Sequence, residues 1–252
     1  VIGIPYSDSE NTFETSSAFR EQQSKVALVP YKEGAPRLQF ETFAGLDVGK
    51  TCHLTIFRRN GKNIELIWAE KINNTKDNPA LDQIIKRYNY FNVKKMCIDA
   101  GPDITLVNSL VSAKEGISAV VYVRSTASLT AIDVKQNGDV INADRTKTLS
   151  LFLSKHNSGE IMYPDNYDIT FDVFEHLKTT KKIRERSSDG NMAERFCKSN
   201  DTDHWVHSIN YAMIANASCE VDTSFIVPVG ALIGTAKLNS FRSYEENKLF
   251  YW

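Results

Sequence analysis

Three aspartates stand at positions where a carboxylate is unusual and could do chemistry. Asp47 lies inside an apolar run, between Gly45 and Gly49, and both glycines let a ligand or another backbone approach closely. Asp99 ends a later apolar run, and Asp203 directly precedes a stretch of helical character. A carboxylate within an apolar strand is costly unless its charge is paired or bound to a metal ion. If the three side chains converge, a divalent cation would offset their mutual repulsion.

Oxygen ligands without a thiolate favour Mg²⁺ or Mn²⁺ as that cation. Taken singly, each acid has an ordinary alternative, because Asp99 could form a turn and Asp203 could cap a helix. Asp201 lies two residues before Asp203 and could replace it or join it as a ligand. His207 lies one turn after Asp203 on the same helical face, so it could orient a ligand or a water, or be a buried structural histidine. The order of the three acids along the chain is therefore stronger evidence than any one of them.

The elements that must position these acids follow from hydrophobic periodicity. Residues 43–48 form one apolar run, and residues 52–57 and 64–68 alternate between apolar and polar side chains. Asn60-Gly61 between them is a pair suited to a tight hairpin turn. This pattern predicts an antiparallel three-stranded meander that carries Asp47 on its first strand.

The next part of the chain alternates between helical and strand patterns. The spacing predicts a helix over 81–88, a strand over 93–98, a helix over 104–111 and a strand over 117–123. This β-α-β-α-β order implies parallel pairing and places Asp99 at the carboxyl end of a strand. A sheet with an antiparallel meander followed by parallel strands, flanked by helices, is the predicted α/β fold class.

The remaining pattern continues the alternation. It predicts a turn at Asn137-Gly138, a helix over 141–156, a strand over 161–164, a helix through 169–177, a charged hairpin over 181–200 with Asp189-Gly190-Asn191 at its centre, and a helix over 203–217. Residues 1–40 are polar and aperiodic, so we expect a lead-in or linker segment packed on one domain over 41–219. Residues 220–252 form a mixed tail that packs on the domain or serves as a docking element.

Composition narrows the class of protein. The 252 residues include 30 Lys and Arg against 31 Asp and Glu, and this near-zero charge argues against a generally basic nucleic-acid coat while leaving room for a local patch. Hydrophobic residues at 42% and charged residues at 24% exclude collagen, coiled coil and wholesale disorder. No apolar run reaches the ~18 residues of a membrane span. The four cysteines show no C-x-x-C spacing and the chain shows no signal peptide, so we expect packed thiols in the cytosol. Because the sequence starts at Val1, we expect a piece of a longer protein.

Basic side chains gather on two of the predicted elements and would supply phosphate contacts without sequence readout. They are Arg145, Lys147, Lys178, Lys181, Lys182, Arg184 and Arg186. Acidic neighbours, including Glu185 and Glu194, dilute this patch. A solvated charged face is the competing interpretation.

Five short segments, in this order, resemble the nuclease domain of the large terminase subunit of tailed phages, within the ribonuclease-H-like superfamily. They are residues 43–49, 96–101, 142–147, 159–164 and 203–212. The resemblance covers roughly residues 40–217, and its specificity comes from the order and spacing of the motifs.

The resemblance implies a metal-dependent endonuclease that cuts concatemeric viral DNA during genome packaging. Asp47 would bridge two Mg²⁺ or Mn²⁺ ions about 4 Å apart, and Asp99 and Asp203 would complete their ligand shells. The ions would activate water and stabilise the leaving 3′-oxygen. The implied partners are double-stranded viral DNA, the portal, the small terminase subunit and an ATPase domain of the same polypeptide, in the host cell cytoplasm and without a membrane.

Other functions compete with this one. Ala44-x-x-x-x-Gly49-Lys50-Thr51 fits a relaxed phosphate-loop pattern, but the residues after it alternate as a strand, whereas a phosphate loop leads into a helix. The segment 45–51 also looks like the first phosphate motif of actin-like ATPases, which need a second domain. A resolvase or transposase with the same acids is a nearer alternative, although residues 144–147 and 159–164 favour terminase. A non-catalytic interaction module that docks through the tail is the remaining class.

Overall fold

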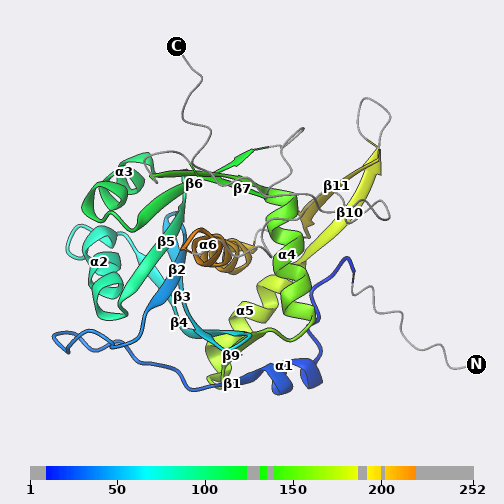
Figure 1. The fold of residues 1–252 in the computed structure, drawn as a ribbon, viewed down its shortest axis with the longest axis horizontal. Coiled ribbons are helices and arrows are strands. Elements are labelled where there is room, and N and C mark those ends of the chain that lie inside the picture. Colours follow the sequence, from blue (N-terminus) through cyan, green and yellow to red (C-terminus); the bar gives the residue numbers. More distant parts are fainter. Residues whose placement is uncertain (1–9, 124–130, 135–138, 187–191, 200–201, 220–252) are drawn as a thin grey trace, which may run out of the picture.

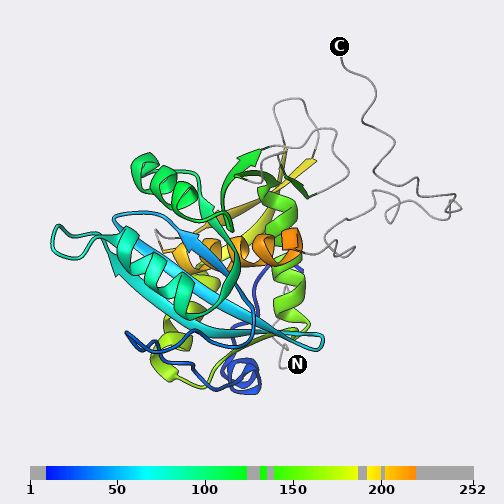
Figure 2. The ribbon, with the colours of Figure 1, turned by 60° about the vertical axis from the view of Figure 1, so that its left-hand side comes forward.

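Helices cover both faces of one large mixed sheet (Figures 1 and 2). The computed structural model describes residues 10–123, 131–134, 139–186, 192–199 and 202–219. Within this part of the chain the sheet has nine strands in the order β1-β9-β4-β3-β2-β5-β6-β8-β7. The expected turn at Asn137-Gly138 and the tail 220–252 lie outside the described residues.

The predicted meander forms the centre of the sheet. It consists of β2 (Thr42–Asp47), β3 (Thr51–Asn60) and β4 (Asn63–Asn73). Asn60 pairs with Asn63 across the turn, where Gly61 has a φ of 61° that a side chain would disfavour. Both β3 contacts, to β2 and to β4, are antiparallel, as the sequence predicts.

The parallel half of the sheet follows, also as predicted. It contains α2 (Ala80–Tyr90), β5 (Val93–Asp99), α3 (Ile104–Ala113) and β6 (Ile117–Val123). β5 pairs in parallel with β2 on one side and with β6 on the other. The central order β4-β3-β2-β5-β6, with β3 antiparallel to its neighbours, is that of the ribonuclease-H-like sheet, so the predicted fold class is confirmed.

The helix predicted over 141–156 is wrong at its start. Residues 140–144 form strand β8 (Val140–Asp144), which pairs with β6 and with β7 (Ile132–Val134), and α4 (Arg145–Asn157) begins only after it. Asp144 sets the boundary because its side chain accepts a hydrogen bond from the Lys147 amide at 3.0 Å. Ile141 and Ala143 are buried on the strand.

Residues before position 41 contribute to the same sheet. α1 (Ser17–Gln23) leads into β1 (Ser24–Val26), which pairs in parallel with β9 (Ile161–Pro164), and β9 pairs with β4. The two strands of the predicted charged hairpin are present as β10 (Thr180–Arg186) and β11 (Met192–Lys198), which pair antiparallel outside the large sheet, and its expected centre at 189–191 lies outside the described residues.

The two faces of the sheet carry separate hydrophobic cores. α2 and α3 cover one face, while α4, α5 (Tyr167–Thr179) and α6 (His204–Cys219) cover the other (Figure 1). No helix in the described part of the chain is long and apolar enough to span a membrane.

α6 lies directly against β2 at Gly45. A Cβ atom at this position would overlap the Ser208 carbonyl oxygen and the Ala212 backbone nitrogen of the helix. The Ser208 hydroxyl instead donates to the Gly45 carbonyl oxygen at 3.0 Å and lies 2.9 Å from the Thr55 hydroxyl on β3. The glycine therefore brings the first turns of α6 close to the carboxyl end of β2.

Candidate active site

Asp47 and Asp99 lie side by side at the carboxyl ends of neighbouring parallel strands. β2 and β5 are in register at Leu46 and Ile98, so the next residue of each strand is an aspartate. Asp47 is only 7% exposed and Asp99 is half-buried. Burial raises the pKa of Asp99, and the nearby Asp47 adds to the rise. A 3.4 Å hydrogen bond from the Gly101 amide acts in the opposite direction and lowers this pKa. The two carboxyl groups are therefore neighbours at one edge of the sheet.

Asp203 precedes α6 and contacts two basic side chains. Its Oδ2 atom lies 3.2 Å from His207 Nε2, and its Oδ1 atom lies 3.3 Å from Lys198 Nζ on β11. Burial alone would raise the pKa of Asp203, but His207 and Lys198 together hold it well below its usual range. Asp203 is therefore a buried, ionised carboxylate next to α6.

His207, which the sequence marked as a supporting residue, faces two groups through one nitrogen. Nε2 lies 3.2 Å from Asp203 and 3.4 Å from Arg145 Nη2. A guanidinium can only donate and a carboxylate can only accept, so Nε2 satisfies one of them at a time. The shorter distance favours donation to Asp203, which gives His207 a positioning role toward that carboxylate.

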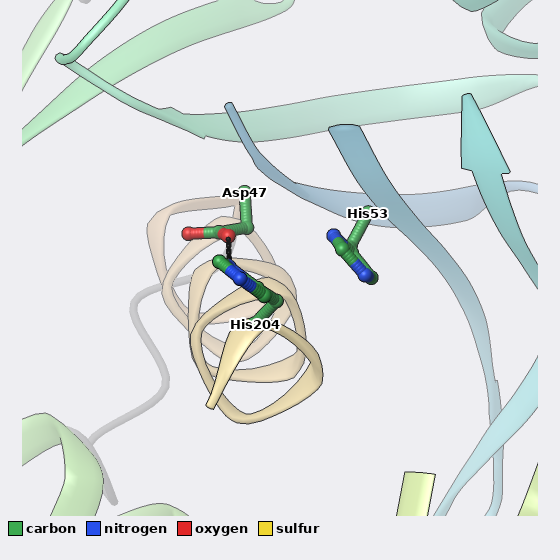
Figure 3. Close-up of side chains that lie close together, drawn as sticks. All are labelled: Asp47, His53 and His204. Carbon is green, nitrogen blue, oxygen red and sulfur yellow. Dashed lines mark hydrogen bonds and ion pairs between the residues drawn. The ribbon is translucent and has the colours of Figure 1, made fainter. Parts of the chain in front are cut away.

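His204, the first residue of α6, contacts Asp47 directly. Its Nδ1 atom lies 2.8 Å from Asp47 Oδ2 (Figure 3). Because a carboxylate can only accept, this nitrogen carries the proton. The hydrogen bond to Asp47 raises the pKa of His204.

His53 completes a group around Asp47 that was not predicted. It lies directly opposite Asp47 in the β2–β3 register and its ring stacks on that of His204, with centroids 4.7 Å apart and planes at 12° (Figure 3). Burial lowers the pKa of His53 to about 3, so the ring is neutral. Its Nδ1 atom is buried and has no hydrogen-bond partner among the described residues. One ligand atom from each of Asp47, His53 and His204 lies within 4.8 Å of the others.

These residues fit a divalent cation on the chemistry of their donors. Asp47 and Asp99 concentrate negative charge at one edge, and a dication would offset both the repulsion and the cost of burial. The buried Nδ1 atom of His53 has no hydrogen-bond partner among the described residues, and one nitrogen of this ring belongs to the group with Asp47 and His204. A sequence signal for His53 did exist, because the short link between β2 and β3 places it opposite Asp47.

The predicted basic residues fall into two groups. Arg145 lies at the site, where Nη1 donates to the Phe196 carbonyl oxygen at 3.3 Å and Nη2 faces His207. Lys147 lies 3.8 Å from Asp144, which caps its helix, and Lys178 lies 3.9 Å from Glu175 on its own helix. Lys198, which was not predicted, contacts Asp203 from the hairpin. The position of Asp201 lies outside the described residues.

The hairpin patch is partly neutralised by its own acids. Lys182 and Arg184 both contact Glu194 on the partner strand, at 3.6 and 2.8 Å. Lys181 and Arg186 are exposed and form no ion pair with a residue that the structure describes. These two side chains are the part of the predicted patch that is most open to a phosphate.

The phosphate-loop pattern does not form a phosphate loop. Lys50 lies in the turn after β2, and Thr51 begins β3 rather than a helix. No helix N-terminus therefore follows this motif to hold a phosphate.

Comparisons with known proteins return only structural similarities. No protein-family profile and no curated protein sequence matches the chain. The large terminase nuclease from thermophilic phage G20c is similar over 78% of this chain and 96% of its own, at 13% identity and a TM-score of 0.46. The same nuclease with bound magnesium is similar over 79% and 96%, at 14% identity and 0.46. The large terminase of a second thermophilic bacteriophage is similar over 76% of this chain and 42% of its own, at 12% identity and 0.46. Structures of the family that the sequence resembles are thus among those similar to this chain.

Proposed function

We propose that this chain is the nuclease domain of a phage large terminase and hydrolyses phosphodiester bonds of concatemeric viral DNA during genome packaging. The observation that carries the proposal is the pair of Asp47 and Asp99 at the carboxyl ends of adjoining parallel strands, with His204 at the start of α6 in contact with Asp47 and Asp203 directly before it in the chain. The five sequence segments that resemble terminases, and the strand order around them, support the same assignment.

Each acid has a separate task in this proposal. Asp47 lies between Asp99 on β5 and the imidazole of His204, so it would be shared between two ions, Mg²⁺ or Mn²⁺. Asp99 and Asp203 would each supply further oxygen ligands, with His207 and Lys198 holding Asp203 in place and ionised. When bound, such ions supply an activated water and stabilise the charge of the leaving oxygen.

The DNA side of the proposal rests on basic residues around the acids. Arg145 and Lys198 lie within reach of the acidic cluster and would contact phosphates next to the scissile bond. Lys181 and Arg186 would extend that track along the hairpin. Contacts of this kind give affinity without reading base sequence.

We further propose the context that the family implies. The domain over 41–219, with β1 from the lead-in added to its sheet, would act beside an ATPase domain of the same polypeptide, the portal and the small terminase subunit, in the host cytoplasm. The tail over 220–252 would pack on the domain or dock to one of these partners.

Plasmid cleavage tests the proposed function. The chain is incubated with plasmid DNA and Mg²⁺, Mn²⁺ or EDTA, beside the variants Asp47→Asn and Asp99→Asn. Each variant should lose more activity than the about 10- to 100-fold typical of a group that only orients a metal ligand. The matched control is Asp165→Asn, an exposed acid outside the site, which should cut normally. Cleavage that survives EDTA or both substitutions contradicts the proposal, and ATP hydrolysis by this chain would favour the ATPase alternatives.

A further inference from the structure

The side of Asp47 that faces β3 differs chemically from the side that faces β5. On the β5 side its neighbour is a carboxylate, Asp99, whereas on the β3 side its neighbours are the imidazoles of His53 and His204. We propose that Asp47, His53 and His204 form a mixed oxygen–nitrogen site that binds a transition-metal dication such as Mn²⁺ or Co²⁺ in preference to Mg²⁺. The proposal deepens the proposed function and rests on it for the role of Asp47 in catalysis.

The backbone brings these three residues together from separate elements. Asp47 ends β2, His53 is its direct cross-strand partner on β3, and His204 begins the helix that packs on β2 at Gly45. Ligand atoms of the three lie within 4.8 Å of one another (Figure 3), and an ion bound between them would release to solvent the proton through which His204 now contacts Asp47. Side chains contributed by two strands and a helix converge here, so the group is set by the tertiary fold rather than by one flexible loop.

His53 supplies the second, independent observation. The residue is 5% exposed, yet its Nδ1 atom has no hydrogen-bond partner among the described residues. Buried polar atoms are normally paired, and an unpaired one in a native structure requires an explanation such as a bound ion. The ring is also held in place, stacked on His204 and edge-on to Trp205 at 4.7 Å and 89°.

The donor set decides which ions fit. Mg²⁺ prefers oxygen ligands and keeps several of its waters, so two imidazoles are poor ligands for it. Imidazole nitrogen suits first-row transition metals, whose affinity for mixed sites rises from Mn²⁺ through Co²⁺. The acidic side of Asp47, with Asp99, remains suited to Mg²⁺ or Mn²⁺. The mixed site would therefore discriminate between ions where an all-carboxylate site would not.

A packing role is the competing explanation for His53, because aromatic rings surround it. His176 tests this alternative, since its ring lies 6.0 Å from that of His53 in the same cluster. Unlike His53, His176 is engaged, because its Nδ1 atom accepts the Trp205 amide at 3.2 Å. It also lies outside the three-residue ligand group.

Direct binding of the metal alone tests the inference without measuring activity. The metal-free chain is titrated with Co²⁺, followed by its visible absorption, and with Mn²⁺ and Mg²⁺ by calorimetry. We expect Co²⁺ and Mn²⁺ to bind at least about tenfold more tightly than Mg²⁺. His53→Phe, which keeps a stacking ring and removes both nitrogens, should weaken Co²⁺ binding at least about tenfold and leave Mg²⁺ affinity within about twofold. His176→Gln, which keeps an acceptor for Trp205, should bind Co²⁺ as the parent chain does.

Two results overturn the inference: equal affinity for Mg²⁺ and Co²⁺, or a folded His53→Phe chain that binds Co²⁺ unchanged. Circular dichroism establishes whether that variant folds. If it does not, His204→Ala carries the same expectation, because this side chain is 46% exposed and its removal leaves the core intact. Plasmid cleavage run in parallel separates the two proposals. If the chain cuts DNA with Mg²⁺ but binds Co²⁺ equally well without His53, only the inference is refuted. If Co²⁺ binding depends on His53 but no ion supports cutting, only the proposed function is refuted.

Discussion

Replacing Gly45 by alanine tests the contact between β2 and α6 on which the whole site depends. The added Cβ atom would overlap the Ser208 carbonyl oxygen and the Ala212 backbone nitrogen. Both are backbone atoms of a helix, so no side chain can move aside and the first turns of α6 must shift. The 3.0 Å hydrogen bond from Ser208 to the Gly45 carbonyl oxygen would lengthen with that shift.

The expected cost can be worked from these contacts. Overpacking a well-filled core costs about 1–3 kcal/mol, and contact with backbone places this site at the upper end. Loss of the Ser208 hydrogen bond adds about 1 kcal/mol. For a domain of this size each kcal/mol lowers Tm by about 2–4 °C, so a loss of about 3–4 kcal/mol corresponds to a fall of about 6–16 °C.

Thermal unfolding by circular dichroism, with urea denaturation for the free energy, provides the assay. Gly101→Ala is the matched control, because a Cβ atom there would meet nothing within 4 Å, and we expect a change within about 0.5 kcal/mol. Without the clash, alanine in a strand would be favoured over glycine by about 0.5–1 kcal/mol. A Gly45→Ala chain that melts at or above the parent Tm would therefore refute the close packing of α6 on β2.

Charge and protonation carry three further predictions. Burial lowers the pKa of His156 to about 4, so between about pH 6.5 and 4 the unfolded chain binds one more proton than the folded chain. Through this residue the unfolding free energy should fall by about 2 kcal/mol from pH 7 to pH 5. In urea denaturation of His156→Gln, the fall over the same pH range should be smaller by that amount. An unchanged pH dependence in the variant would contradict the prediction. Lys181→Ala should reduce the salt slope of DNA binding, measured by fluorescence anisotropy, by about 1. Arg184→Ala should reduce it by less, because Glu194 lies 2.8 Å from the Arg184 guanidinium and already neutralises it. Equal effects of the two variants would count against this ion pair. Mn²⁺ at about 100 times its Kd should stabilise the chain by about 2.7 kcal/mol in thermal unfolding, reversibly with EDTA, and the same gain in Asp47→Asn would exclude this site as its origin.

Local pattern predicted most of the central elements correctly, and the helix that it misplaced shows one way in which it fails. Residues 141–156 were expected to form a single helix, whereas the first of them continue the sheet as β8. A strand of five residues is too short for its period of two to stand out when a 13-residue helix follows at once. The Asp144 cap marks the boundary, yet the same residue also fits within a helix in sequence alone.

The sequence by itself determined the order of the central elements from β2 to β6, the class of sheet, and the placement of Asp47 and Asp99 on strands whose carboxyl ends meet. Those features depend on the pattern of apolar and polar residues along each segment and on short connections between segments, and both can be read from the sequence. Only the tertiary structure decided that His53 faces Asp47, that His204 reaches the same carboxylate, and that Lys198 contacts Asp203 from the hairpin. Each of these contacts requires a hairpin register, the close approach of α6 at Gly45, or the docking of β11, and such packing between elements distant in sequence leaves no periodic signal in the chain.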